Sequence, residues 1–354
     1  MGFSAGLYQK LFRASPVRIR WQVMKRGVLI VGTGSIGERH ARCFGQLADV
    51  EVSICEPNEP LRRRVAEAYA VRQALADYDQ APLEEFEAVV ICTPAPLHIP
   101  MAIRALRAGC HVLCEKPLST SLDGVDDLRE AICASGRVFR VAYTWRRHPG
   151  MQWVKSQLAG GSIGRPSQAT IVSGQDFAFF RPAYREIYYA RHESGGGAIQ
   201  DGATHMVDFL VWCLGPARSV SCEADHLALE GVRVEDTVSL TLRFQNSPAI
   251  ATLVMNQFQK NNDLRVEVAG ILGTVRFDIA DERCSIFRDG QWRHTPVPAR
   301  DRDANYIDQA AAFFDAIDDR ASNLCTLDEA VHVLRAVLGA MLSAREGKRV
   351  DLTE

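Results

Sequence analysis

The chain has 354 residues, and its 41 lysines and arginines nearly balance its 43 aspartates and glutamates. This balance gives no indication of a nucleic-acid or membrane-surface partner, and no apolar run reaches the roughly 18 residues of a spanning helix. The length accommodates two domains of ordinary size, each able to bury a core. The cysteines are scattered without the paired spacing of a zinc site, so we expect reduced thiols, no metal and a cytoplasmic protein.

The first 25 residues are basic and contain no acid, since the first carboxylate in the chain is Glu38. Two interpretations stay open. An arginine-rich, acid-free start is typical of an organelle transit peptide. We favour the simpler interpretation, in which Met24 is the true start or the preceding residues are a loose arm. Residues 1–25 are therefore predicted to be an extension outside the folded domains.

A glycine-rich turn follows the first predicted strand, Val28–Val31, and residues with helical spacing follow the turn. Strand, G-x-G-x-x-G and helix in this order form the dinucleotide-binding fingerprint. Gly32 permits the tight turn, Gly34 lets the backbone approach a pyrophosphate, and Gly37 lets the helix pack closely on the strand. The helix N-terminus then faces the phosphate charge. The predicted cofactor loop consists of Gly32, Thr33, Gly34, Ser35, Ile36 and Gly37.

The second predicted strand, Val50–Cys55, runs into Glu56, about 20 residues past the glycine loop. A carboxylate there accepts a hydrogen bond from the 2′-hydroxyl of NAD and repels the 2′-phosphate of NADP, so NAD is favoured. A solvated turn acid is the alternative. NADP remains the alternative cofactor because three arginines follow, one of which could reach its 2′-phosphate. These arginines also suit the solvated face of the next helix: Arg62, Arg63 and Arg64.

Two further predicted strands, 88–92 and 111–114, end in residues that we place at the ligand edge of the sheet. Prolines stop both strands and stiffen the loops that follow them. Ligands bind at the carboxyl ends of the strands in such sheets. An ordinary surface lysine is the alternative for Lys116. The predicted cofactor contacts at this edge are Thr93, Pro94, His98, Glu115 and Lys116.

The alternation of strands and helices ends near residue 145. We therefore predict an α/β Rossmann domain over 26–145, followed over 146–354 by a domain that binds substrate and forms oligomers. This second domain is predicted to be α+β with an open, mostly antiparallel sheet, whose spare face helices or another subunit must cover. Two C-terminal helices, 304–318 and 327–345, are expected to pack back toward the first domain. The predicted strands of the second sheet are 167–173, 238–244, 249–254, 265–269, 275–279 and 284–288.

The segment 176–193 is dense in aromatic residues and arginines. Aromatic faces and guanidinium groups suit sugar rings and anionic groups, so we expect this segment to contact a substrate. A loop packed on its own core, or a subunit contact, is an equal alternative. The predicted substrate contacts here are Tyr184, Arg185 and Tyr188. The three arginines of this segment, Arg181, Arg185 and Arg191, favour a sugar that carries a phosphate or a nucleotide.

A glycine cluster at 195–197 opens a helix predicted at 198–214. Asp201 and His205 are four residues apart and would share a face in its first turns. The helix dipole favours Asp201 as an anion, and an anion beside the imidazole would hold its tautomer. A plain salt bridge is the alternative, and a metal pair is weaker because no third ligand stands at motif spacing.

From about Arg26 to its end, the chain resembles the glucose-fructose oxidoreductase / inositol dehydrogenase (Gfo/Idh/MocA) family. Each motif is weak alone, but their ordered set is specific. The motifs are Gly32–Gly37, Thr93-Pro94 with His98, Glu115-Lys116-Pro117, Arg146 with Pro149, Ser162-Ile163-Gly164, Gly195–Gly197 with Asp201 and His205, Glu235-Asp236-Thr237 and Ser343–Gly347.

This resemblance implies NAD(P)-dependent hydride transfer at a secondary alcohol of a sugar, sugar nucleotide or cyclitol, by a dimer or a dimer of dimers. It implies that Lys116, Asp201 and His205 are catalytic and also contact the substrate, and that Arg146 belongs with the cofactor contacts. His205 would take the hydroxyl proton, Lys116 would hydrogen-bond the same oxygen, and Asp201 would orient the imidazole. Lysine and histidine could also exchange roles.

Two other functions fit the same fold. One is an NAD(P)-binding sensor without turnover, which the intact Lys116, Asp201 and His205 argue against. The other is a lyase or glycosidase that oxidises its substrate transiently and recycles its NAD. Net reduction of the nicotinamide distinguishes a dehydrogenase from both.

Overall fold

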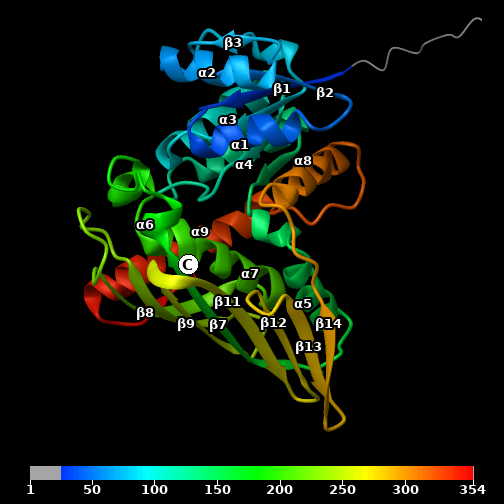
Figure 1. Cartoon of the computed structure of the whole chain (residues 1–354), viewed down its shortest axis with the longest axis vertical. Helices are drawn as coiled ribbons and strands as arrows, with labels where there is room; N and C mark the ends of the chain where they lie inside the picture. Colours follow the sequence, from blue (N-terminus) through cyan, green and yellow to red (C-terminus); the bar gives the residue numbers. More distant parts are fainter. Residues whose placement is uncertain (1–24, 354) are drawn as a thin grey trace, which may run out of the picture.

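The computed structural model describes residues 25–353, so the predicted extension lies, apart from Lys25, outside the described residues. The chain folds around two sheets, one in the blue and cyan half of Figure 1 and the other in the green, yellow and orange half. One sheet is parallel and the other is mostly antiparallel. This arrangement confirms the predicted fold class.

The first sheet has six strands in the order β3-β2-β1-β4-β5-β6, and every pairing is parallel. This is the Rossmann order, in which the chain changes direction between β1 and β4. The crevice at that point lies at the carboxyl ends of the strands. The strands are β1 Arg26–Val31, β2 Val50–Cys55, β3 Ala74–Leu75, β4 Ala88–Ile91, β5 His111–Cys114 and β6 Phe139–Val141.

Helices cover both faces of this sheet. Leu29 and Val31 of β1 belong to the core formed with α3 and α4, whereas Val28 and Ile30 face α1 and α2. Burial on both faces explains why these strands read as continuous apolar runs in the sequence. The helices are α1 Ser35–Phe44, α2 Glu59–Tyr69, α3 His98–Arg107 and α4 Val125–Ser135, with short 3-10 turns η1 Leu83–Glu85 and η2 Ala95–Leu97.

The second sheet has nine strands in the order β14-β13-β12-β11-β7-β10-β9-β8-β15. Its pairings are antiparallel except that of β7 with β10. Its strands are β7 Pro166–Asp176, β8 Ala217–Asp225, β9 Thr237–Phe244, β10 Ile250–Asn256, β11 Phe258–Gly270, β12 Thr274–Asp278, β13 Arg283–Arg288, β14 Gln291–Pro296 and β15 Val350–Asp351.

The sequence pattern did not predict β8, β14 and β15. All residues of β14 are exposed, so this strand lacks the alternation that marks a half-buried strand. Its pairing with β13 holds it in the sheet instead.

Helices cover one face of the second sheet and leave the other open. Ala251 and Leu253 of β10 are buried beneath the helices, whereas Ile250 and Val254 remain 40% and 46% exposed. Among residues 25–353, no helix is both long and apolar enough to cross a membrane. The remaining helices and turns are η3 Thr144–Arg147, α5 Pro149–Ala159, α6 Phe177–Phe180, η4 Tyr188–Ala190, η5 His192–Ser194, the π-helix η6 Ile199–Ala203, α7 Thr204–Leu214, α8 Ala304–Ile317 and α9 Leu327–Glu346.

Helix α8 returns to the first sheet and packs on α1 (Figure 1). The ring of Phe314 lies 6.0 Å from that of Phe44, centroid to centroid. Beside this contact, Arg42 Nε donates to Asp303 Oδ2 at 2.5 Å. The apolar residues of α8 therefore complete the core on the α1 face of the parallel sheet.

Candidate active site

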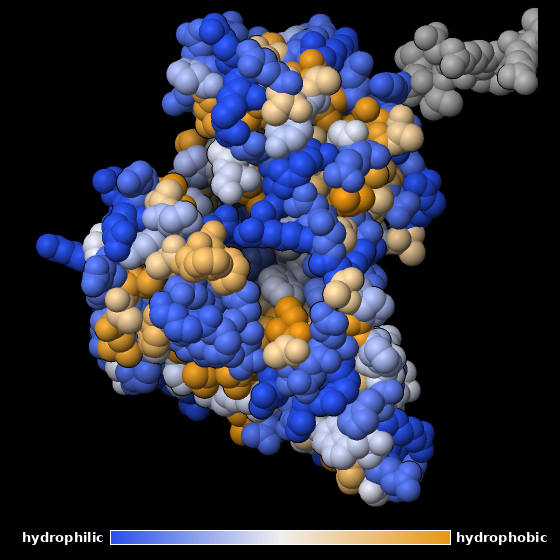
Figure 2. Space-filling model, viewed as in Figure 1, coloured by the Kyte–Doolittle hydropathy of each residue, from blue (hydrophilic) through white to orange (hydrophobic). Residues whose placement is uncertain are grey.

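A cavity of about 1110 Å³ lies between the two sheets, at the carboxyl ends of β1, β4 and β5. In Figure 2 it opens as a recess between the two halves of the molecule. Its wall includes residues from the glycine loop, the segment after β7 and the start of the helix that carries His205. The cavity thus joins the two predicted sites, for cofactor and for substrate.

The glycine loop has the geometry that its pattern predicts. Gly32 has a φ of +80°, in the left-handed region that favours glycine. A Cβ on Gly37 would lie 1.8 Å from the Gly32 carbonyl oxygen, so only glycine permits α1 to pack this closely. Gly34 has open space beside it and lines the cavity with Ser35. An uncovered backbone at a helix N-terminus fits a diphosphate.

Glu56 lies across from this loop on the cavity wall. Its carboxylate accepts hydrogen bonds from the backbone N–H groups of Thr33 at 2.8 Å and Asn58 at 3.0 Å. These contacts fix the carboxylate where the adenosine ribose of a dinucleotide is expected.

The three nearby arginines are engaged elsewhere and do not line the cavity. Arg62 donates to the Glu56 carbonyl oxygen at 2.6 Å. Arg63 pairs with Glu59 on the same helix, and Arg64 pairs with Glu38 of α1. None of these guanidinium groups is free to bind a 2′-phosphate without giving up its partner.

His98 ties two loops of the cavity wall together. Its Nδ1 lies 2.9 Å from the Pro117 carbonyl oxygen and its Nε2 lies 2.8 Å from the Thr93 carbonyl oxygen. The ring is 1% exposed, and burial lowers its pKa. His98 therefore positions the loops at Thr93-Pro94 and Lys116-Pro117.

Glu115 anchors the loop that carries Lys116. Its Oε1 lies 2.7 Å from His40 Nε2, and its Oε2 accepts from the Lys116 backbone N–H at 3.1 Å. Burial opposes the charged form, but the bond to His40 and the charge of Lys116 outweigh it and lower the pKa of Glu115. The loop is thereby fixed to α1, one turn beyond the glycine loop.

Lys116 and Asp201 form an ion pair on the cavity wall. Lys116 Nζ donates to Asp201 Oδ1 at 2.9 Å and to the Asp201 carbonyl oxygen at 3.0 Å, and the Tyr188 hydroxyl donates to the same Oδ1 at 2.7 Å. Burial would raise the pKa of Asp201, but Lys116 and Tyr188 together lower it. Burial and the Asp201 charge raise the pKa of Tyr188. Asp201, which Tyr188 also bonds, therefore holds the Lys116 ammonium at a fixed point.

The predicted α-helix over 198–214 begins instead as the π-helix η6. Here the Thr204 N–H donates to the Ile199 carbonyl oxygen, five residues back, and α7 follows. A wider turn rotates Asp201 relative to the i, i+4 alignment that we predicted. Asp201 bonds Lys116 and Tyr188, and within residues 25–353 no hydrogen bond joins its carboxylate to His205.

His205 lines the cavity beside Lys116. Its Nδ1 is buried and has no hydrogen-bond partner in the described part of the chain. The ring packs edge-on against Tyr143 at 5.8 Å between centroids. Burial, followed by the charge of Lys116, lowers the pKa of His205 to about 3. The imidazole is therefore neutral at physiological pH.

Three of the predicted site residues do not line this cavity. Arg146 is 2% exposed, and its guanidinium donates to Asp208 and Glu329 as part of the core. The Tyr184 hydroxyl donates to the Glu230 carbonyl oxygen at 2.5 Å, and Arg185 Nε donates to the same oxygen at 2.8 Å. An aromatic-rich segment can fold on its own small core, and this one does so in part.

Other cavity residues escaped the sequence reasoning. Several come from elements far along the chain whose approach to the cleft only the fold determines. One of them, Gln257, follows β10 and continues its alternation as a buried residue, so a polar side chain at a buried position was the available signal. The unpredicted residues include Met101, Trp145, Gln175, Asn256, Gln257, Asn262 and Tyr306.

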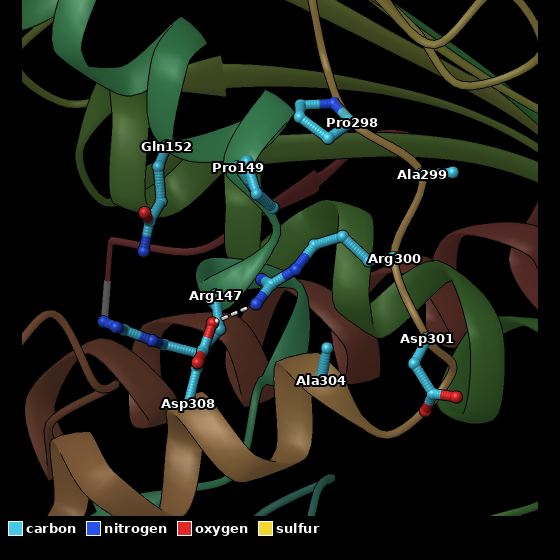
Figure 3. A pocket seen from close by; sticks show the side chains of 9 residues that line it. All are labelled: Arg147, Pro149, Gln152, Pro298, Ala299, Arg300, Asp301, Ala304 and Asp308. Atoms are coloured by element: carbon cyan, nitrogen blue, oxygen red, sulfur yellow. Dashed lines mark hydrogen bonds and ion pairs between the residues drawn. The ribbon is translucent and has the colours of Figure 1, made fainter.

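A second cavity of about 560 Å³ lies between α5, α8 and the loop that precedes α8 (Figure 3). Within it, Arg300 pairs with Asp308 at 2.7 Å. It contains none of the predicted site residues. Its lining is Arg147, Pro149, Gln152, Pro298, Ala299, Arg300, Asp301, Ala304 and Asp308. The first cavity is therefore the candidate active site.

Fold and cavity together define a dinucleotide-binding oxidoreductase. Residues 26–143 match the family model described as "Oxidoreductase family, NAD-binding Rossmann fold", and residues 151–276 match "GFO/IDH/MocA C-terminal domain". The chain belongs to the Gfo/Idh/MocA family of oxidoreductases, as its motifs indicated, and its parallel sheet is an NAD-binding Rossmann fold.

The chain is similar to several known oxidoreductases. The oxidoreductase YrbE of Bacillus subtilis is 25% identical, over 91% of this chain and 95% of its own length. An inositol 2-dehydrogenase/D-chiro-inositol 3-dehydrogenase of Shouchella clausii is 27% identical, over 74% of this chain and 75% of its own. A solved levoglucosan dehydrogenase, in complex with NADH and levoglucosan, has a TM-score of 0.82 at 22% identity and covers 93% of this chain and 100% of its own. This last likeness concerns the fold.

Proposed function

We propose that this enzyme transfers hydride between NAD and a secondary alcohol carbon of a neutral sugar or cyclitol. The observation that supports this most is the meeting of Lys116, Asp201 and His205 with the glycine loop in one cavity. The names of the inositol and levoglucosan dehydrogenases agree with this substrate class.

The residues present fit the cofactor. The open backbone at Gly34, the N-terminus of α1 and the carboxylate of Glu56 would hold the diphosphate and the adenosine ribose. When bound there, the cofactor supplies a hydride acceptor or donor. Because Glu56 is an acid and the arginines beside it are engaged, NAD is proposed over NADP.

The roles of the side chains follow from their charges. Asp201 and Tyr188 hold the Lys116 ammonium, which would donate a hydrogen bond to the substrate oxygen and stabilise its alkoxide character. His205 is neutral and would accept the hydroxyl proton. Of the two candidates that the sequence left open, His205 is therefore the proposed base, although burial makes it a weaker base than an exposed histidine.

The side chains of the cavity wall indicate which class of substrate fits. Near the second sheet it carries uncharged amides, which suit the hydroxyl groups of a sugar: Gln175, Asn256, Gln257 and Asn262. Of the three arginines that favoured a phosphorylated substrate, only Arg181 lines the cavity. A neutral polyhydroxylated substrate is therefore proposed.

Purified protein is expected to reduce NAD when supplied with neutral polyols or anhydrosugars, and to do so faster than with sugar phosphates, sugar nucleotides or NADP. Nicotinamide absorbance and product mass, recorded together, test this. Mass change without net reduction would favour recycled NAD. Absence of both, with tight NADH binding, would contradict turnover on these substrates.

We further propose that the open face of the second sheet pairs with a second copy. Its exposed apolar side chains on β10, Ile250 and Val254, belong to an antiparallel sheet that needs a cover. Sedimentation velocity is expected to give the mass of two or four chains. A single-chain mass at micromolar concentration would contradict this pairing.

A further inference from the structure

Arg181 extends from the loop after α6 toward the glycine loop on the other side of the cleft. Its Nη1 donates to the Ser35 hydroxyl at 3.4 Å, and Ser35 is the first residue of α1. Within residues 25–353 its guanidinium makes no other hydrogen bond or ion pair. A cation that belongs to the second half of the chain thus lies at a helix N-terminus, where a phosphate group would bind.

Arg181 is also close to the catalytic groups. Beyond the effects of burial and of Lys116, its charge lowers the pKa of both Asp201 and His205. Arg181 lines the same cavity as Lys116, Asp201 and His205 and reaches Ser35 of the glycine loop. A dinucleotide with its ribose at Glu56 and its nicotinamide at Lys116 must pass its diphosphate through this region.

Two more arginines approach from other elements. Burial, and then the charges of Arg39 and Arg181, lower the pKa of Arg302 in the loop before α8. Arg39 pairs with Asp303 at 3.3 Å, but that carboxylate also binds Arg42. The region consequently holds more guanidinium charge than its carboxylates neutralise, which favours an anionic ligand.

We infer that Arg181 binds the diphosphate of the cofactor, so that the substrate side of the cleft completes the cofactor site. This inference rests on the proposed function. It gives Arg181 a role other than the one expected from the sequence, in which the arginines of this segment bind an anionic group on the substrate. A guanidinium suits a phosphate because its parallel N–H groups match two phosphate oxygens.

The test compares R181Q with R191Q by titration with NADH, ADP-ribose and adenosine. Arg191 belongs to the same segment, is exposed and does not line the cavity, so the control removes the same charge. R181Q is expected to weaken binding of NADH and ADP-ribose about 10- to 100-fold, because a charge-assisted bond is lost, and to leave adenosine unchanged. R181K is expected to bind with intermediate affinity.

The outcomes separate this inference from the proposed function. NADH and ADP-ribose affinities in R181Q within two-fold of wild type would overturn the inference alone. If those affinities stayed normal while KM rose for sugar phosphates only, Arg181 would bind the substrate anion instead. If wild type and R191Q also failed to bind NADH, the proposed function would fall together with the inference. Equal weakening for adenosine would indicate a general structural defect and would also overturn it.

Discussion

Replacing Lys116 with methionine is expected to lower kcat/KM by about 10³-fold while NADH affinity stays within a few-fold of wild type. Methionine preserves much of the side-chain length but removes the ammonium that faces the substrate oxygen. Loss of one such donor typically costs 10²- to 10³-fold, and loss of the charge adds to this. The cofactor is held mainly by the glycine loop, so its binding is spared. Steady-state kinetics and NADH titration measure the two effects.

A matched control is K348M, because Lys348 is exposed and pairs with Glu346. K116M also leaves Asp201 as a buried anion without its partner, which destabilises the fold. The double variant K116M/D201N neutralises that anion. It is expected to recover thermal stability without recovering turnover. Recovery of turnover in the double variant, or a K116M rate above a tenth of wild type, would show that the ammonium is not required.

Replacing His205 with asparagine is expected to lower kcat/KM by about 10²- to 10⁴-fold, the usual range for a positioned base. The effect should fall on kcat more than on NADH binding. H294N is the control, since His294 is exposed on β14 and bonds Ser285. A rate for H205N within three-fold of wild type would exclude His205 as the base.

The pKa of His205 gives this prediction a second readout. Because burial lowers the pKa to about 3, the imidazole stays neutral as pH falls through 6.5, where a free histidine would be protonated. Wild-type kcat/KM should therefore show no acid limb near pH 6.5. The unfolded state takes up this proton first, so stability falls as pH drops from 6.5 toward 3. H205N should lose less stability over that interval, which denaturant titration at several pH values measures.

The parallel sheet could be read from the sequence almost completely. Its strands are buried on both faces and its turns carry glycine and proline, so that Gly32, Gly37 and the Lys116 loop lie where local pattern predicts. Local pattern does not determine which partner a side chain finds across the fold. Arg146 is an example: the preceding residues Thr144 and Trp145 line the cavity, yet its own guanidinium is neutralised in the core by Asp208.

The start of the helix that carries His205 shows the same limit. Four-residue spacing predicts that Asp201 and His205 share a face only if the turn between them is an α-turn. The π-turn packs closely against the second sheet. A Cβ on Gly202 would lie 2.0 Å from the Met255 methyl group of β10, so the backbone approaches the sheet closely at this point. Such contacts between distant segments leave no periodic signal in the sequence.

The return of α8 to the parallel sheet has a consequence for any exchange of parts between relatives. A chimera that took only residues 26–145 from another family member would separate Phe44 from Phe314 and Arg42 from Asp303. It would also replace the strand whose Val141 N–H donates to the Cys325 carbonyl oxygen. The inherited unit of the nucleotide-binding half is therefore discontinuous, and a workable graft must carry residues 303–325 along with it.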